Sequence, residues 1–242
     1  MKIIKNEKLI ARNSKIVNYI STAGMIIFLA YLFITVKILI KPETLSSQTT
    51  LLSFGLLVLS FIFIQISSYL GPRFGKSPRI DEKLDASLKG LHSDNTLFHY
   101  TTPVSHLLVG PAGIWVILPY FQNGKVEYSK NRWRQPGGTF SQKYMRILGF
   151  DRLGRPDNDA NSEVNLLNKL FSKKNIDINS SDIQAVLVFT SDDLELEASD
   201  SPVPAMKLKQ LKEFLRQKTK ERGVPNIQMA AINKLLGNEQ QS

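Results

Sequence analysis

The chain of 242 residues contains no cysteine. Disulfides, thiol nucleophiles, Cys-ligated zinc and iron–sulfur centres are therefore excluded. The sequence also lacks a phosphate-binding P-loop, a dinucleotide-binding Gly-x-Gly-x-x-Gly and a Gly-x-Ser-x-Gly nucleophile elbow. The commonest routes to cofactor binding and covalent catalysis thus have no signature here.

Charge is missing from two long stretches. The first apolar run, Ile16 to Val36, would reach about 30 Å as a helix, which is the thickness of the hydrocarbon core of a bilayer. The second, Leu51 to Leu70, is almost as long and is interrupted only by Ser, Gly and Gln. We predict a transmembrane hairpin over residues 16–72, with helices at about 16–40 and 50–71. A signal peptide for the first run, or buried core helices for both, are the alternatives.

The basic residues predict how this hairpin is oriented. Half of the net charge of +10 lies in residues 1–72, and residues 1–15 form a basic N-terminus. Its cations are Lys2, Lys5, Lys8, Arg12 and Lys15. More cations follow the second run, at Arg73, Lys76 and Arg79, and the connecting loop has fewer. By the positive-inside rule both termini are cytoplasmic, in a protein integral to the cell membrane with two spans and the lipid bilayer as a partner.

Residues 73–242 are expected to form one cytoplasmic α/β domain with a mixed central sheet. A leucine stripe from Ile80 to Leu91 predicts a helix, and β-rich segments follow at 96–101, 106–109 and 114–118. Gly110 to Gly113 reads as a tight turn, and Asn123-Gly124 as a hairpin that returns residues 125–128 to the preceding strand.

The second half of this domain is predicted to alternate helices and strands. After a loop-rich stretch (129–156) we expect a helix around 164–171, a buried strand at 183–190 and an edge strand at 194–196. One helix is expected to begin at Pro204, and a last helix is expected over residues 225–236.

The chain has three histidines, His92, His99 and His106, and no two have the spacing of helical metal ligands. His99 and His106 fall on neighbouring predicted strands, so they either share a site or are half-buried structural residues. Ser105 and His106 are adjacent and project to opposite faces of a strand, which argues against a Ser–His nucleophilic pair.

Residues 125–155 form a basic loop with a net charge of +6 and interleaved aromatic residues. The anion-binding candidates are Lys130, Arg132, Arg134, Lys143, Arg146 and Arg152. Clustered cations attract nucleic acid by counterion release and equally attract anionic lipid headgroups. An ordinary solvated surface loop, headgroup binding and nucleic-acid binding all remain open.

The predicted order helix–β–β–β–helix–β, with His-Leu-Leu-Val-Gly-Pro-Ala-Gly-Ile-Trp-Val-Ile at residues 106–117, resembles the nuclease-related domain (NERD) family. The later Val-Leu-Val-Phe at 186–189 is similar too. The resemblance covers about residues 79–219 and implies a core like that of the PD-(D/E)XK nucleases. In active members, carboxylates on the central strands hold Mg²⁺ through oxygen, and the metal together with a lysine polarises water and phosphate.

The positions that match the family's site depart from it. They are Asp81, Ser105, Leu118 and Tyr120. Only Asp81 retains a metal-ligating group, since leucine cannot ligate magnesium and tyrosine is neutral near pH 7. We therefore expect no catalytic residues, no metal and no cofactor, and a binding or scaffolding role at the membrane. The alternative is a divergent Mg²⁺-dependent nuclease in which Glu127, Glu163 or Asp192 has taken over as ligand.

Overall fold

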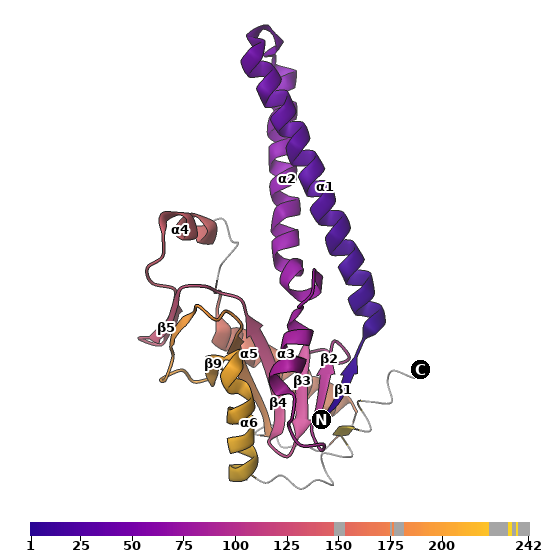
Figure 1. Ribbon diagram of the computed structural model, residues 1–242, viewed down its shortest axis with the longest axis vertical. Coiled ribbons are helices and arrows are strands. Elements are labelled where there is room, and N and C mark those ends of the chain that lie inside the picture. The colour runs from indigo at the N-terminus through magenta and orange to yellow at the C-terminus, as the bar shows by residue number, and fades with distance from the viewer. Residues whose placement is uncertain (148–152, 175, 177–181, 223–231, 234–235, 237–242) are drawn as a thin grey trace. The chain divides into compact units, whose positions relative to one another are not determined.

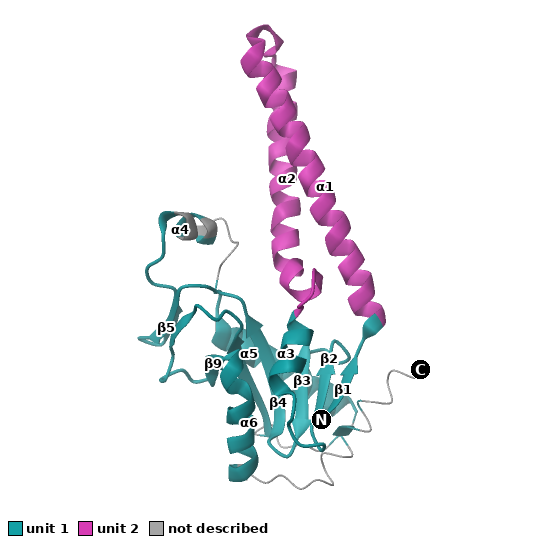
Figure 2. Cartoon of the chain, in the orientation of Figure 1, with its two compact units in different colours: residues 1–7, 80–242 teal, residues 8–79 magenta. Residues whose placement is uncertain are grey.

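The computed structural model describes residues 1–147, 153–174, 176, 182–222, 232–233 and 236. The chain divides into two compact units (Figure 2). Unit 1 comprises residues 1–7 and 80–242, and unit 2 comprises residues 8–79. Figure 1 labels the elements of both.

Unit 2 is a helical hairpin made by α1 (Glu7–Ile40) and α2 (Ser47–Phe74), joined through a short 3₁₀ turn, Pro42–Thr44. The two helices pack closely at Gly24, where an added Cβ would lie 2.9 Å from the Cβ of Phe63. Ser21 and Ser67 share a hydrogen bond of 2.9 Å between their hydroxyl oxygens. Small residues at this contact let the two backbones approach each other.

Both helices are long and apolar enough to cross a membrane, and only 6% of the most apolar stretch of each is buried. That exposure is the opposite of what core helices of a soluble domain show. The helices are longer than the predicted spans. α1 begins at Glu7, because the polar residues before Ile16 continue the helix, and α2 passes through Pro72 to Phe74.

Unit 1 is built on a six-stranded sheet in the order β1-β2-β3-β4-β7-β9. The strands are β1 (Lys2–Lys5), β2 (Thr96–His99), β3 (His106–Gly110), β4 (Gly113–Tyr120), β7 (Ile183–Phe189) and β9 (Ala205–Lys207). β3 runs antiparallel to β2 and β4, and the other neighbours are parallel, so the predicted mixed sheet is confirmed.

Helices cover both faces of this sheet. α3 (Ile80–Leu88) and α6 (Leu208–Arg222) pack on the face that carries Leu97, Leu108 and Trp115. α5 (Pro156–Lys173) packs on the opposite face. Because side chains alternate along a strand, a strand between two helical layers is apolar on both sides. This explains the unbroken apolar run in β4.

Residues 1–15, predicted only as a basic N-terminus, contain a strand and the start of a helix. β1 pairs parallel to β2, with Ile3 opposite Leu97 and Ile4 opposite Phe98, and Ile4 packs against the core below α5. Four residues at a chain end carry too little pattern to predict a strand, since their partner lies beyond the whole hairpin. The N-terminus therefore belongs to unit 1.

The predicted return of residues 125–128 onto the preceding strand is wrong. β5 (Lys125–Ser129) lies in a separate three-stranded sheet, between β6 (Arg132–Arg134) and β8 (Glu195–Glu197). β5 instead forms a β-hairpin with β6. The two strands are joined by Lys130 and Asn131, which both have positive φ. Long-range pairing with β8 and burial of Val126 outweigh the local turn signal at Asn123-Gly124.

Other expectations hold with shifted limits. The tight turn is confirmed by the pairing of Gly110 with Gly113, and β8 lies at an edge as expected. The stretch 129–156 contains α4 (Phe140–Ile147) as well as β6, and β9 precedes the helix expected from Pro204. Most of the helix predicted over 225–236 lies outside the described residues, although Ile232 and Leu236 are buried.

Candidate functional site

The candidate functional side chains of unit 1 lie at one end of the strands of the six-stranded sheet. β1, β2 and β4 finish at this end and β3 begins there, as the register of the four strands requires. The chain leaves β1 for α1 here, and it returns here at the start of α3, where Asp81 contacts Lys5. We call this end of the strands the hairpin edge, because both chain connections to unit 2 start from it.

A lysine and two carboxylates meet at the hairpin edge. The ammonium of Lys5, at the end of β1, lies 3.0 Å from Oδ2 of Asp81 and 2.5 Å from Oδ2 of Asp85. Both aspartates are on α3, at the helical positions that share a face with Leu84 and Leu88, so they turn toward the sheet. The Asp81 side chain is fully buried, whereas Lys5 and Asp85 retain less than a fifth of their exposure.

The cluster continues into a pair of buried histidines. Nε2 of His99 lies 3.0 Å from Oδ1 of Asp85, and Nδ1 of His99 lies 2.7 Å from Nδ1 of His106. Because a carboxylate only accepts, Nε2 of His99 donates to Asp85. The contact between the two Nδ1 atoms requires one ring to donate and the other to accept. We call the five side chains Lys5, Asp81, Asp85, His99 and His106 the buried polar cluster.

The ionisation of the cluster reflects its burial and its partners. Burial disfavours the charged form of Lys5, yet hydrogen bonds to Asp85 and Asp81 outweigh it and hold the pKa of the ammonium raised. Burial likewise opposes ionisation of Asp85, but hydrogen bonds from His99 and Lys5 prevail and hold its pKa below the usual value. The geometry therefore keeps Lys5 and Asp85 as an ion pair.

Chemically, this arrangement can hold and shift a proton along connected groups. A proton placed between the two rings of His99 and His106 can move from one to the other. Next to the pair, Tyr100 has φ of +56°, which is uncommon for an aromatic residue, and its ring packs edge-on at 5.0 Å from the ring of His106.

No group of three or more His, Asp or Glu side chains with metal-holding geometry occurs among the residues that the structure describes. In the buried polar cluster, the ammonium of Lys5 contacts both carboxylates from which a cation would take oxygen ligands. A divalent ion would have to displace this lysine.

The four positions that match the family's site are not brought together. Asp81 lies under α3, on one face of the sheet, whereas Leu118 and Tyr120 pack on the face covered by α5. The hydroxyl of Tyr120 donates to Asp159 on α5 at 2.9 Å. Ser105, which immediately precedes β3, is exposed, and His106, the first residue of β3, is buried.

The three carboxylates considered as replacement ligands each interact with different residues. Glu127 accepts from Ser129 in β5, and Asp192 forms an exposed ion pair with Lys209. Glu163 is on α5, where burial, and then the neighbouring charge of Asp159, raise the pKa of its carboxyl.

The basic loop is only partly free to bind anions. Lys130, Arg132, Arg134 and Lys143 are exposed. Lys125 instead pairs with Glu197 and Glu195 on the neighbouring strand β8. The guanidinium of Arg146 donates to the carbonyl oxygens of Gln135 and Gly137 and so fixes α4 to the preceding turn. Arg152 lies outside the described residues.

Lys5 and Asp85 are not among the site residues predicted from the sequence. A signal was available, because Asp81 and Asp85 occupy positions of the apolar stripe of α3, and carboxylates on a buried stripe need partners. Lys5 could not be found, since β1 itself is unpredicted. His99 and His106 contact each other across neighbouring strands, and the two rings are fully buried rather than half-buried. Comparison of the chain with protein-family models, with curated proteins and with solved structures finds no match in any of the three.

Proposed function

We propose that this chain is a membrane-anchored binding module, in which a non-catalytic α/β unit of the nuclease-related type is held at the cytoplasmic membrane face by a two-span hairpin. Its ligands are anionic, and the basic loop binds them.

The observation that carries the anchoring is the pairing of β1 with β2. β1 precedes the hairpin and β2 follows it, yet the two strands are hydrogen-bonded neighbours over four residue pairs. Segments before and after the hairpin must then lie on the same side of any membrane that it crosses. Two spans satisfy this condition and one does not, which supports the two-span topology over a cleaved signal peptide. The excess of cations at both ends of the hairpin favours the cytoplasmic side.

The non-catalytic role is supported by what occupies the positions of the family's site. Leu118 is part of the hydrophobic core, and Tyr120 is engaged with Asp159. Asp81, which does carry a carboxylate, is paired with Lys5 and has no exposed surface. Binding is supported by the four exposed cations of the basic loop, which lie within 14 residues of one another.

The binding role can be tested with heparin as a polyanion probe on the full chain in detergent. Arg132→Glu/Arg134→Glu should elute at lower salt and bind about tenfold more weakly, because binding by counterion release scales with the number of cations. The matched control is Lys169→Glu/Lys173→Glu, which changes the net charge equally on exposed positions of α5. Equal losses for both variants would mean that net charge, not the basic loop, governs binding.

The buried polar cluster supports a second candidate, the divergent Mg²⁺-dependent nuclease. Two carboxylates, a lysine and two histidines lie at one edge of a nuclease-like sheet, and these are the group types that such chemistry uses. The full chain should be used, because residues 73–242 alone lack β1 and Lys5. We expect no cleavage of labelled DNA or RNA with Mg²⁺ or Mn²⁺ beyond that of Asp85→Asn. Cleavage that Asp85→Asn and Asp81→Asn abolish would establish the nuclease and refute the binding module.

A further inference from the structure

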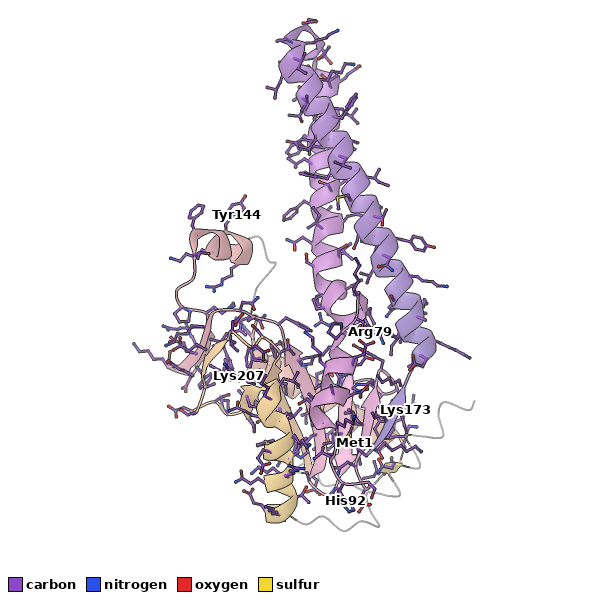
Figure 3. All side chains as sticks on the ribbon, viewed as in Figure 1. Met1, Arg79, His92, Tyr144, Lys173 and Lys207 are labelled. Atoms are coloured by element: carbon purple, nitrogen blue, oxygen red, sulfur yellow. The ribbon has the colours of Figure 1, made fainter. Side chains whose placement is uncertain are left out.

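The short helix α4 exposes two aromatic side chains. Phe140 is 87% exposed and Tyr144 is 55% exposed, and they are four positions apart, so they lie on one side of the helix. Figure 3 shows the Tyr144 side chain on α4, pointing away from the sheet of unit 1. Lys143 on the same helix is exposed as well. Large aromatics beside cations are typical of helices that lie in the interface of a membrane.

The topology of unit 1 places both ends of the segment that contains α4 at the hairpin edge. β4 runs parallel to β1, so the segment that follows β4 leaves the sheet at the edge where β1 continues into α1. The segment returns at the start of α5, where Asp159 accepts from Tyr120 at the end of β4. Residues 121–155 are therefore an insertion that begins and ends at the hairpin edge. Within unit 1, α4 stands away from the sheet (Figure 2).

The connections from this edge to the hairpin are short. A single residue, Asn6, separates β1 from α1, and five residues separate α2 from α3. The hairpin edge is therefore tethered by short connections to any bilayer that holds the hairpin. The position of α4 within the insertion is supported by Arg146, whose guanidinium binds the carbonyl oxygens of Gln135 and Gly137 at 2.8 and 3.0 Å.

We propose that α4 is a third membrane contact, in which Phe140 and Tyr144 enter the headgroup region of an anionic leaflet while Lys143 and the β6 arginines bind its phosphates and carboxylates. This inference rests on the proposed membrane anchor and names the ligand of the basic loop. An anionic leaflet is favoured over nucleic acid because the insertion that carries α4 starts from the hairpin edge, where the chain is connected to the proposed anchor. Solvent-exposed phenylalanine also gains from burial at the acyl boundary, where cations remain in water.

The absence of cysteine allows a direct test. Phe140→Cys in the full chain, labelled with the environment-sensitive dye NBD, is reconstituted into nanodiscs of phosphatidylcholine with or without phosphatidylserine. We expect a blue shift and protection from a water-soluble quencher in the phosphatidylserine discs, and a smaller change in phosphatidylcholine alone. Tyr144→Cys should behave alike. Adding Arg132→Glu/Arg134→Glu should reduce the difference between the two lipids.

Two control labels separate the possible failures. Ser93→Cys, an exposed position before β2 and so at the other end of the sheet, should stay in water in both lipids. Leu59→Cys within α2 should report an acyl-chain environment. If Leu59 is in water, the proposed anchor fails. If Leu59 is in lipid but the label at 140 stays in water, or responds only to an added DNA duplex, the inference about α4 is wrong and the anchor stands.

Discussion

Asp85 connects the two halves of the buried polar cluster. One oxygen accepts from His99 and the other pairs with Lys5, so a single carboxylate links α3 to β1 and to β2. Buried ionic groups add stability only when every partner is in place, and removing one partner leaves an uncompensated charge. The tolerance of the fold to substitution here is therefore low, although the net contribution of the intact cluster is modest.

Asp85→Asn should destabilise unit 1 by about 2–3 kcal/mol, near the low end for a broken buried ion pair because Asp85 keeps 19% of its exposure. The midpoint of thermal unfolding of the full chain in detergent, followed by near-ultraviolet circular dichroism, measures the loss. Asp94→Asn is the control, since its ion pair with His92 is exposed and should contribute less than 1 kcal/mol. Similar midpoints for both variants would show that the cluster is not coupled to folding.

The pKa shift of Asp85 also predicts how stability depends on pH. Its folded pKa lies below the unfolded value of about 3.9, so its contribution is fully present above that value and is lost as pH falls through the folded pKa. Stability of the wild type should therefore fall below about pH 4, and Asp85→Asn should show a shallower fall. Unfolding midpoints collected from pH 6 to pH 2.5 would test this, and parallel curves would contradict it.

At the scale of elements, the sequence predicted those whose residues repeat a strong local pattern. The apolar runs of α1, α2 and β4 and the stripe of α3 identify themselves, because burial on one or both faces leaves a period in the sequence. β1, β6 and α4 did not, because each is short and depends on distant partners. The buried polar cluster was half visible for the same reason. His99 and His106 lie on predicted strands. Lys5, in contrast, comes close to Asp81 only because β1, which precedes the hairpin in the sequence, pairs with β2, which follows it.

The packing of α1 on α2 depends on Gly24. A Cβ at this position would lie 2.9 Å from that of Phe63, so Gly24→Leu should push the helices apart, whereas a Cβ at Gly55 would meet nothing within 4 Å, which makes Gly55→Leu the control. Separation can be read from the double variant Ser21→Cys/Ser67→Cys, whose hydroxyls lie 2.9 Å apart in the native chain. We expect rapid oxidative cross-linking in this background and slower cross-linking with Gly24→Leu. Equal rates in the Gly24→Leu and Gly55→Leu backgrounds would contradict this contact.

At the scale of the whole molecule, unit 1 is assembled from the two segments that precede and follow the hairpin of unit 2 in the sequence. The N-terminal strand supplies an edge of the sheet and the lysine of the buried polar cluster, so synthesis of the hairpin and folding of unit 1 are linked. A domain completed in this way cannot fold fully until both helices of the hairpin have been made. This organisation explains why a boundary drawn at residue 73 from composition alone separates residues that fold together.

Unit 1 should consequently become a soluble domain if residues 8–79 are replaced by a Gly/Ser linker of roughly six residues, because Lys5 and Asp81 already lie 3.0 Å apart. Residues 80–242 alone should be less stable or aggregate, since they expose the hydrogen-bonding edge of β2 and leave Asp81 buried without its lysine. Adding Lys5→Met to the linked variant keeps β1 but removes the ammonium, and it should fall between the two. Thermal unfolding and size-exclusion chromatography compare the three. If residues 80–242 match the linked variant in stability and solubility, β1 is an accessory strand. Its pairing with β2 then no longer requires that residues 1–7 and 80–242 lie on the same side of a membrane.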